Sequence, residues 1–318
     1  TPITNLNFVE LTPGEDLATT LYAYRNRSDV RFAEPDYIRQ LLRDPNDPAF
    51  TSLDLWGLHN IGQNGGTADA DIDAPEAWNI ATGSSDVIVA VLDTGVDYTH
   101  PDLAANMWVN TGEIAGNGID DDNNGYVDDV YGYDFSDGDA DPMPTGNSAP
   151  YHGTHCAGTI GAVGDNGVGL TGVCWNVKLM ALKVFDTATT SVLVNALEYA
   201  VANGAQISNN SYGGYGYSQA QYDSIAAAME AGHLFVAAAA NDSINNDASP
   251  AYPASYDLPN IISVAASDRN DQLASFSNTG RTTVDLAAPG VAIYSTFPVA
   301  LGPYSSIQGT SMAAPHVA

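Results

Sequence analysis

Basic side chains are scarce in this sequence of 318 residues, which holds 9 Lys and Arg against 38 Asp and Glu and has a formal net charge of −29. Five of the nine are arginines that precede residue 44, so residues 44–318 carry four basic residues and 32 acidic ones. We expect no nucleic-acid partner, because a surface of this sign repels phosphate. Simple solubility and adaptation to a saline setting account for the acidic surplus equally well, and part of it suits bound cations.

Cysteine and long apolar runs are also lacking. Cys156 and Cys174 are too few for a disulfide framework, and with the nearby histidines they lack the paired spacing of zinc ligands, so we expect free, mostly buried thiols. No apolar segment has the length needed for a membrane span. No signal peptide is visible and the chain begins with Thr1 rather than Met, so we expect it to start inside a longer gene product.

Strand-like and helix-like patterns alternate through most of the chain. The expected strands cover 87–92, 178–185, 206–209, 234–240 and 261–265, and the expected helices begin near 152 and cover 192–203 and 218–231. This alternation predicts an α/β fold with a doubly wound, mostly parallel sheet flanked by helices. In such sheets reactive groups lie beyond the carboxyl ends of strands, where Asp93 and Asn241 fall.

The first 43 residues follow a different pattern. Strand-like runs at 8–11 and 30–33 flank a helical run at 14–27, which predicts a small α+β unit. The stretch 39–48 contains several Asp and Pro residues and is typical of an exposed linker. We therefore expect two domains, 1–43 and 44–318.

Three short motifs supply an acid, a base and a nucleophile. They are V-L-D-T-G-V around Asp93, H-G-T-H-C-A-G-T from His152, and G-T-S-M-A-A-P-H around Ser311. A serine hydroxyl needs an imidazole to take its proton, and the imidazole needs a carboxylate to fix its tautomer. Asp-Thr-Gly alone also resembles the loop of aspartic proteases, but a second such loop is absent and the other two motifs would stay unexplained.

In their order Asp, His, Ser, these motifs closely resemble the signatures of the subtilisin-like serine proteases, over roughly residues 47–318. The resemblance implies that Asp93 orients the base His152, that Ser311 is the nucleophile, and that His155 is structural. It also implies an oxyanion hole formed by the Ser311 N–H and the Asn241 amide. The family usually has Gly before this Asn, so Ala240 implies a narrower first specificity pocket.

Further segments match the family in the same way. Ser211, Tyr212 and Gly213 match the segment that pairs with an extended peptide or protein substrate, and Ala239 and Ala240 border its pocket. Residues 30–37 resemble the end of an inhibitory propeptide, which implies an extracellular enzyme made as a self-processing zymogen and cleaved in the linker. The alternative is an N-terminal extension without an inhibitory role. In the family the helix after the nucleophile continues, so we expect this chain to be truncated at its C-terminus.

Two sets of oxygen ligands predict calcium as a cofactor. The first surrounds a glycine turn and consists of Asp120, Asp122, Asn124, the Tyr126 carbonyl, and Asp128 or Asp129. It is not a complete EF-hand, because no Glu closes it, and a merely solvated acidic loop is the alternative. The second is implied by the resemblance alone and consists of Asp47, Asp102, and Asp165 or Asn166.

The sequence thus favours a calcium-stabilised serine endopeptidase. Two alternatives stay open: an esterase or peptide-ligating acyl transferase that uses the same triad, and a catalytically silent calcium-binding module.

Overall fold

The computed structural model describes residues 7–12, 14–35, 44–146 and 149–318, and the chain divides into two compact units, Thr1–Leu42 and Arg43–Ala318. In the described part of the smaller unit, the one element is helix α1 (Leu17–Arg25), which Asp16 caps by accepting the Thr19 N–H at 2.8 Å. The expected strands at 8–11 and 30–33 are wrong. Neither segment has a ladder partner, and a strand exists only through such pairing; Phe8 is instead 76% exposed.

The larger unit is built on one seven-stranded sheet. Its strands are β1 (Gly83–Asp93), β2 (Gly132–Asp134), β3 (Asn176–Lys183), β4 (Ile207–Asn210), β5 (Leu234–Ala238), β6 (Ile261–Ser267) and β7 (Leu286–Pro289). Their order is β2-β3-β1-β4-β5-β6-β7, and each neighbouring pair is parallel. The predicted parallel sheet is confirmed, with the short β2 and β7 in addition to the five expected strands.

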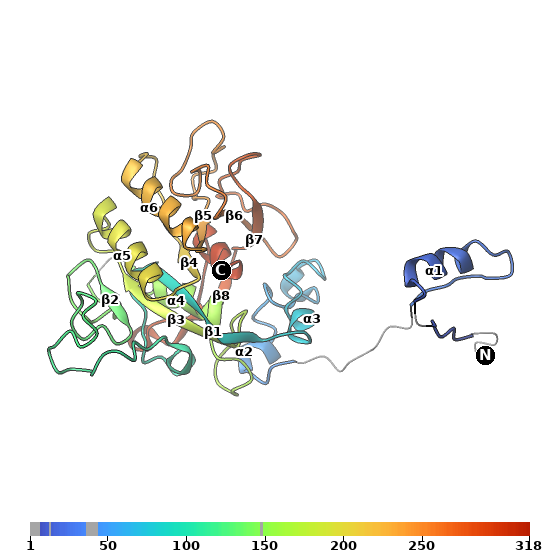
Figure 1. Cartoon of the computed structure of the whole chain (residues 1–318), viewed down its shortest axis with the longest axis horizontal. Helices are drawn as coiled ribbons and strands as arrows, with labels where there is room; N and C mark the ends of the chain where they lie inside the picture. The colour runs from blue at the N-terminus through green and yellow to red at the C-terminus, as the bar shows by residue number, and fades with distance from the viewer. Residues whose placement is uncertain (1–6, 13, 36–43, 147–148) are drawn as a thin grey trace. The chain divides into compact units, whose positions relative to one another are not determined.

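Helices cover both faces of this sheet. They are α2 (Pro48–Thr51), α3 (Ala74–Trp78), α4 (His152–Gly161), α5 (Thr190–Ala202), α6 (Gln219–Glu230) and α7 (Thr310–Ala313), and 3-10 turns cover Gln63–Gly65, Ala104–Asn106, Val299–Leu301 and Ala314–His316. Val91 of β1 shares a core cluster with Ile160 of α4, whereas the next residue, Leu92, shares one with Leu197 of α5 and Ile225 of α6. This alternation explains why β1 is apolar on both faces, and Figure 1 shows α5 and α6 side by side.

The carboxyl ends of the central strands form one edge of the sheet. Asp93 ends β1, Ser211 follows β4 directly, and Asn241 lies three residues beyond β5. On the α4 side, an antiparallel hairpin of β8 (Ile293–Thr296) and β9 (Tyr304–Ile307) packs against the helix. Sequence segments that are far apart therefore meet at this edge.

The end of the predicted linker belongs to the larger unit. Residues 39–43 lie outside the described residues, but Pro45 and Asp47 are buried, and the Asn46 N–H donates to Asp165 Oδ1 at 3.3 Å. The expectation of an exposed linker holds for Asp44, Asn46 and Pro48 but is wrong for Pro45 and Asp47; Asp47 is buried because its carboxylate binds the loop at 165–166. Within the described residues, none of the helices has the length and apolar character needed to cross a membrane.

Candidate active site

The predicted acid and base are in direct contact. His152 is the first residue of α4, and its Nδ1 lies 2.7 Å from Asp93 Oδ1 and 3.0 Å from Oδ2. Asp93 is almost fully buried, and its Oδ1 also accepts the Thr94 N–H at 2.7 Å. Because a carboxylate can only accept, the proton of the neutral imidazole lies on Nδ1, and Nε2 is left free to act as a base.

Gly153 is what permits this close approach of α4 to β1. A Cβ at this position would lie 2.3 Å from the Gly95 carbonyl oxygen and 2.9 Å from Asp93 Cβ, distances that no other residue tolerates. The Gly153 N–H also donates to Thr94 Oγ1 at 3.0 Å. The glycine after the histidine is therefore a packing requirement of the Asp93–His152 pair.

Ser311 lies beside this pair, at the second position of α7. Its hydroxyl donates to the Ser211 carbonyl at 3.1 Å, and Ser211 Oγ donates to the Ser311 carbonyl at 2.9 Å. The Cys156 thiol connects the two predicted residues, because its sulfur lies 3.4 Å from the Ser311 carbonyl oxygen and 4.0 Å from His152 Nδ1. The hydroxyl has one proton, so it must release the Ser211 carbonyl before it can give that proton to His152; catalytic hydrogen bonds often tighten only when substrate binds.

The helix that contains Ser311 is short. α7 has four residues and passes into the 3-10 turn Ala314–His316, because Pro315 has no N–H to continue the helical bonds. The Ser311 N–H nevertheless has no partner within the helix, like the first N–H groups of any helix, and is free to bind an oxyanion.

Asn241 is oriented as a hydrogen-bond donor. Its Oδ1 accepts the Thr310 N–H at 2.8 Å and the Thr310 hydroxyl at 3.0 Å, which leaves Nδ2 to face the site. A point in space at the ideal Cβ position of Gly309 lies 3.6 Å from Ser311 N and 3.7 Å from Asn241 Nδ2. The two predicted oxyanion donors therefore border one common space.

The backbone before Asn241 adopts a conformation that favours glycine. Ala240 has φ = 85°, in the left-handed region, which costs an alanine about 1–2 kcal/mol. Two fully buried asparagines hold this loop: the Asn278 N–H donates to the Ala240 carbonyl at 2.9 Å, and Asn246 Nδ2 donates to the Ala239 carbonyl at 2.9 Å. Neither asparagine is among the predicted site residues, because nothing in the local sequence connects them to Asn241.

The predicted substrate segment is extended and open on one side. Gly214 pairs with Tyr252 through both its N–H, at 2.8 Å, and its carbonyl, at 2.7 Å. Backbone N–H and C=O groups of successive residues in an extended segment point to opposite sides, so Gly213 directs its groups away from Tyr252, and it is exposed. Tyr212 differs from its neighbours, because its ring packs against Phe185 and its hydroxyl donates to Asn210 Oδ1 at 3.0 Å.

Burial and charge tune the ionisable groups here. Burial of His152 disfavours its cation, but the Asp93 carboxylate outweighs burial and raises the pKa of the imidazole well above its ordinary value. Burial raises the pKa of the Cys156 thiol, so it is neutral. The second histidine of the motif, His155, is fully buried with its Nε2 2.9 Å from the Ile293 carbonyl oxygen, and burial lowers its pKa to about 3. It is therefore a neutral packing residue, and both cysteines are free as predicted.

The acidic loop brings together part of the first predicted metal site. Carboxylate oxygens of Asp120, Asp122 and Glu113 all lie within 4.8 Å of one another. Sequence reasoning misses Glu113, because it lies seven residues before the loop. Its Oε1 also accepts the Asp121 N–H at 2.8 Å, which fixes its position beside the loop. Three converging carboxylates form an oxygen donor set that suits calcium.

The remaining residues of this loop mostly support its shape. Asn124 Oδ1 accepts the Tyr126 N–H at 2.8 Å, and the Asp128 carboxylate accepts the Asn117 and Gly118 N–H groups at 3.1 and 2.9 Å. Asp129 is fully buried and accepts from Asn110, Asn124 and the Tyr199 hydroxyl, and burial raises its pKa. Asp129 therefore joins the loop to α5 and lies in the protein interior, away from the exposed side of the loop.

The residues of the second predicted metal site lie close together in the structure. The fully buried Asp47 accepts the Asp165 N–H at 2.7 Å and the Asn166 N–H at 3.3 Å, while Asn166 Nδ2 donates to Asp102 Oδ1 at 3.1 Å. Asp102 is also fully buried and accepts the Tyr304 hydroxyl at 2.8 Å. Burial, and the Asp102 charge nearby, raise the pKa of Asp47. Two buried carboxylates with oxygen-rich neighbours suit a hard cation.

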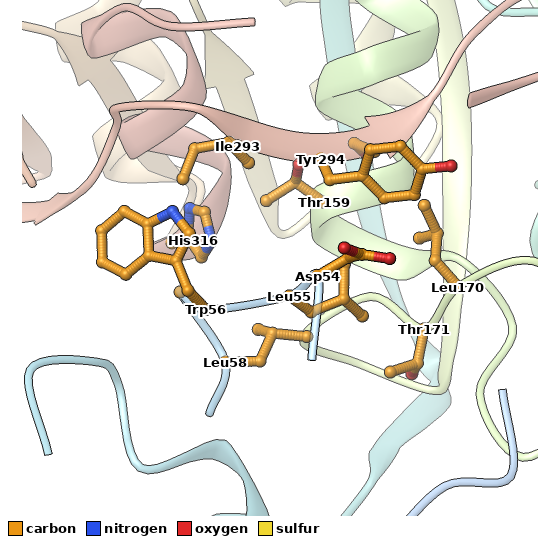
Figure 2. Close-up of a pocket in the computed structure, with 12 residues that line it drawn as sticks. Asp54, Leu55, Trp56, Leu58, Thr159, Leu170, Thr171, Ile293, Tyr294 and His316 are labelled. Atoms are coloured by element: carbon orange, nitrogen blue, oxygen red, sulfur yellow. The ribbon is translucent and has the colours of Figure 1, made fainter. Parts of the chain in front are cut away.

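A small cavity of about 20 Å³ lies away from these groups (Figure 2). It is bordered by Asp54, Trp56, Thr159, Tyr294 and His316, and none of the predicted site residues lines it. Its volume suits a single water molecule. It therefore takes no part in the chemistry of the Asp93–His152 pair and Ser311.

Comparisons with known proteins agree with this arrangement. The model of the Subtilase family matches residues 84–318. A thermophilic serine proteinase of Bacillus sp. strain AK1 is 36% identical over 299 residues, which cover 93% of this chain and 63% of that protein. Thermitase of Thermoactinomyces vulgaris is 38% identical over 86% of this chain and 82% of its own length, and halolysin of Haloferax mediterranei is 34% identical over 98% and 53%.

A solved structure shows the same fold. A protease of Pseudoalteromonas arctica superposes with a TM-score of 0.68 at 31% identity, over 87% of this chain and 85% of that one. The chain spans less than two thirds of the length of the Bacillus proteinase and of halolysin, although it spans most of thermitase.

Proposed function

Because the chain belongs to the subtilase family, we propose that it is a serine endopeptidase that cleaves peptide bonds through an acyl-enzyme on Ser311. The observation that carries the proposal is the Asp93–His152 contact near Ser311, with the Ser311 N–H and the Asn241 amide bordering one common space. A general base, a nucleophile and an oxyanion site in one place are what acyl transfer requires.

Each residue of the site has a distinct part in the proposed reaction. Ser311 Oγ attacks the carbonyl carbon of the substrate while His152 Nε2 takes its proton, and the carbonyl electron pair moves to the oxygen, which the Ser311 N–H and Asn241 Nδ2 stabilise. The carbon–nitrogen bond then breaks and the imidazolium gives its proton to the leaving amine. Water repeats the sequence and releases the acid. Asp93 keeps Nδ1 protonated and stabilises the cation throughout.

Substrate binding follows from the open edge beside Ser311. An extended peptide can pair with the backbone of Ser211 and Gly213, as an added strand does, so recognition depends little on sequence. The side chain before the scissile bond then lies between this segment and the loop that carries Ala239 and Ala240.

Calcium and self-processing complete the proposal. The carboxylates of Glu113, Asp120 and Asp122, and separately those of Asp47 and Asp102, would hold calcium, which neutralises their charge and fixes the loops. The N-terminal unit would be the end of an inhibitory propeptide of an extracellular enzyme. The similarity to halolysin covers 98% of the chain and therefore extends into that unit.

Mass spectrometry of the full-length gene product, incubated with calcium beside its Ser311→Ala variant, tests the proposal. Cleavage between Asp36 and Asp47 in the parent alone would support a self-processing protease. A folded parent that stays intact would contradict it. Hydrolysis of activated esters without cleavage of peptides would then favour the esterase, and failure of a fluorophosphonate to label Ser311 would favour the silent binding module.

A further inference from the structure

Two segments leave the sheet side by side next to Ser311. β4 and β5 are parallel partners, with Asn210 opposite Ala237, so the segment that starts at Ser211 and the loop that starts at Ala239 begin at the same edge. Ser311 binds the first segment and Thr310 binds Asn241 in the second. On the proposed function, the side chain before the scissile bond would lie between these two segments.

A hydrogen bond joins the outer parts of these two segments. The Tyr215 hydroxyl donates to Asp242 Oδ2, and Asp242 directly follows Asn241. Tyr215 is 51% exposed and Asp242 is also exposed, so the bond lies at the rim. The Tyr215–Asp242 bond is thus a second connection between the segments, in addition to their common origin in the sheet.

The two ends of this bond are anchored in the interior. Asn278 is fully buried; its Oδ1 accepts the Asp242 N–H at 2.8 Å and its Nδ2 donates to the Tyr215 hydroxyl at 3.4 Å. The phenol oxygen therefore lies between an acceptor and a donor that are both held by the protein. A surface pair without such support would contribute little.

Glycines flank Tyr215 on both sides, which makes the Tyr215–Asp242 hydrogen bond important for the position of the tyrosine. Gly214 and Gly216 are exposed, and a Cβ at either position would meet nothing within 4 Å. Gly214 is held by its two backbone hydrogen bonds to Tyr252, but Gly216 leaves the backbone permissive on the other side, so the side-chain contact of Tyr215 helps to position it. Without the hydroxyl, Tyr215 has lost the contact that holds it against the loop at 242.

We propose that the Tyr215–Asp242 hydrogen bond is a strap that fixes the separation of these two segments and so limits the size of the side chain accepted before the scissile bond. Tyr215 and Asp242 are then specificity-determining residues that act beside the catalytic groups. Asn278 is a positioning residue, because it acts through them and through Ala240.

The test compares two peptides that differ only in Ala or Phe before the scissile bond. Tyr215→Phe removes the hydroxyl alone. We expect the ratio of kcat/KM for the Phe peptide to kcat/KM for the Ala peptide to rise about tenfold in this variant. A tenfold change corresponds to about 1.4 kcal/mol, which is close to the value of one hydrogen bond to a charged group. Asp242→Ala should do the same, whereas Asp242→Asn keeps an acceptor and should keep the parent ratio.

Tyr217→Phe is the matched control. Tyr217 is 54% exposed and donates to Gln219 Oε1 at 3.2 Å. Tyr217→Phe therefore removes a hydroxyl two residues from Tyr215 and leaves the Tyr215–Asp242 bond in place. An unchanged ratio in both Tyr215→Phe and Asp242→Ala, with or without lower thermal stability, overturns the strap.

A second measurement separates the strap from the proposed chemistry. Calorimetric binding of both peptides to the Ser311→Ala variant, with and without Tyr215→Phe, gives the same ratio without catalysis. If the parent cleaves neither peptide but the binding ratio shifts, the protease proposal fails and the strap holds. If neither peptide binds, both fail.

Discussion

Lys183 offers a quantitative test of the sheet edge that carries Asp93. This lysine ends β3 in register with Asp93 of β1 and Asp134 of β2, and its Nζ lies 2.7 Å from Asp134 Oδ2. The side chains of this pair are 1% and 2% exposed. Asp137 and Asp186 are farther away, at 3.4 and 3.2 Å, and are 59% and 25% exposed. Asp134 is therefore the partner that matters.

The magnitude follows from this geometry. At an effective dielectric constant of about 20, two unit charges 2.7 Å apart attract by about 6 kcal/mol, and the loss of water around both charges offsets much of this. Removal of one partner alone leaves a buried, uncompensated charge and typically costs about 3–5 kcal/mol. We therefore expect Lys183→Met to lower the free energy of unfolding by that amount and the Tm by roughly 10 °C.

The assay is thermal and denaturant unfolding in a Ser311→Ala background, so that self-cleavage does not enter. Adding Asp134→Asn to Lys183→Met should recover about 2 kcal/mol, because the amide keeps the Oδ1 acceptor for the Ser136 N–H but carries no charge. Lys178→Met is the control, since Lys178 is partly exposed and donates to a backbone carbonyl. A cost below about 1 kcal/mol for Lys183→Met, or a double variant that loses the sum of both single losses, would refute the reasoning.

Three further predictions concern the site. Activity requires neutral His152, whose pKa is raised, so kcat/KM should rise with pH through a midpoint above 6.5, while the stability from the charged Asp93–His152 pair is complete below pH 6.5 and is lost as pH rises through that midpoint. Asp93→Asn should lower the midpoint and reduce the rate on the order of 10⁴-fold. An unmoved midpoint in the pH profile of this variant would contradict the assignment. Ala240→Gly should raise the free energy of unfolding by up to about 1 kcal/mol, because the relief of backbone strain at φ = 85° exceeds the entropy cost of glycine. Ala239→Gly should lower the free energy of unfolding. A lower value in both variants would contradict this prediction. Excess chelator should lower the Tm and increase self-cleavage near residues 120–129, and Glu113→Gln should weaken this calcium dependence while Glu76→Gln should not; an unchanged melting transition would exclude the calcium sites.

The parts of the fold that could be predicted are those whose signal is local. The apolar run that ends at Asp93 and the helix that begins at His152 are continuous in sequence, and the structure has both. β2 and β7 have three and four residues, which is too short for a periodic pattern. The predicted N-terminal strands are wrong for a related reason: an alternating pattern shows that a segment can be a strand, but not that it has a partner.

The residues of the candidate sites also differ in whether the local sequence identifies them. Each of Asp93, His152 and Ser311 lies within a motif of consecutive residues, so the sequence could identify them. Glu113 lies beside the acidic loop and Asn278 beside the Asn241 loop only because of the fold. The residues next to a single Glu or Asn in the sequence do not indicate which distant residue it contacts. The departure at Ala240 is intermediate, because the unusual residue is visible in the sequence while its left-handed backbone is visible only in the structure.

The scarcity of basic residues bears on the proposed calcium sites, because few side chains can neutralise a buried carboxylate. Among the described residues, the fully or almost fully buried aspartates include Asp93, which contacts His152, and Asp134, which contacts Lys183. Asp47 and Asp102 have only N–H, amide and hydroxyl donors, and no ion pair of the described part of the chain reaches them. A buried carboxylate without a counter-charge is costly, and four basic residues cannot supply one at every site. On the proposed function, bound calcium would supply the missing charge at Asp47 and Asp102, so removal of calcium should destabilise the fold around these two residues.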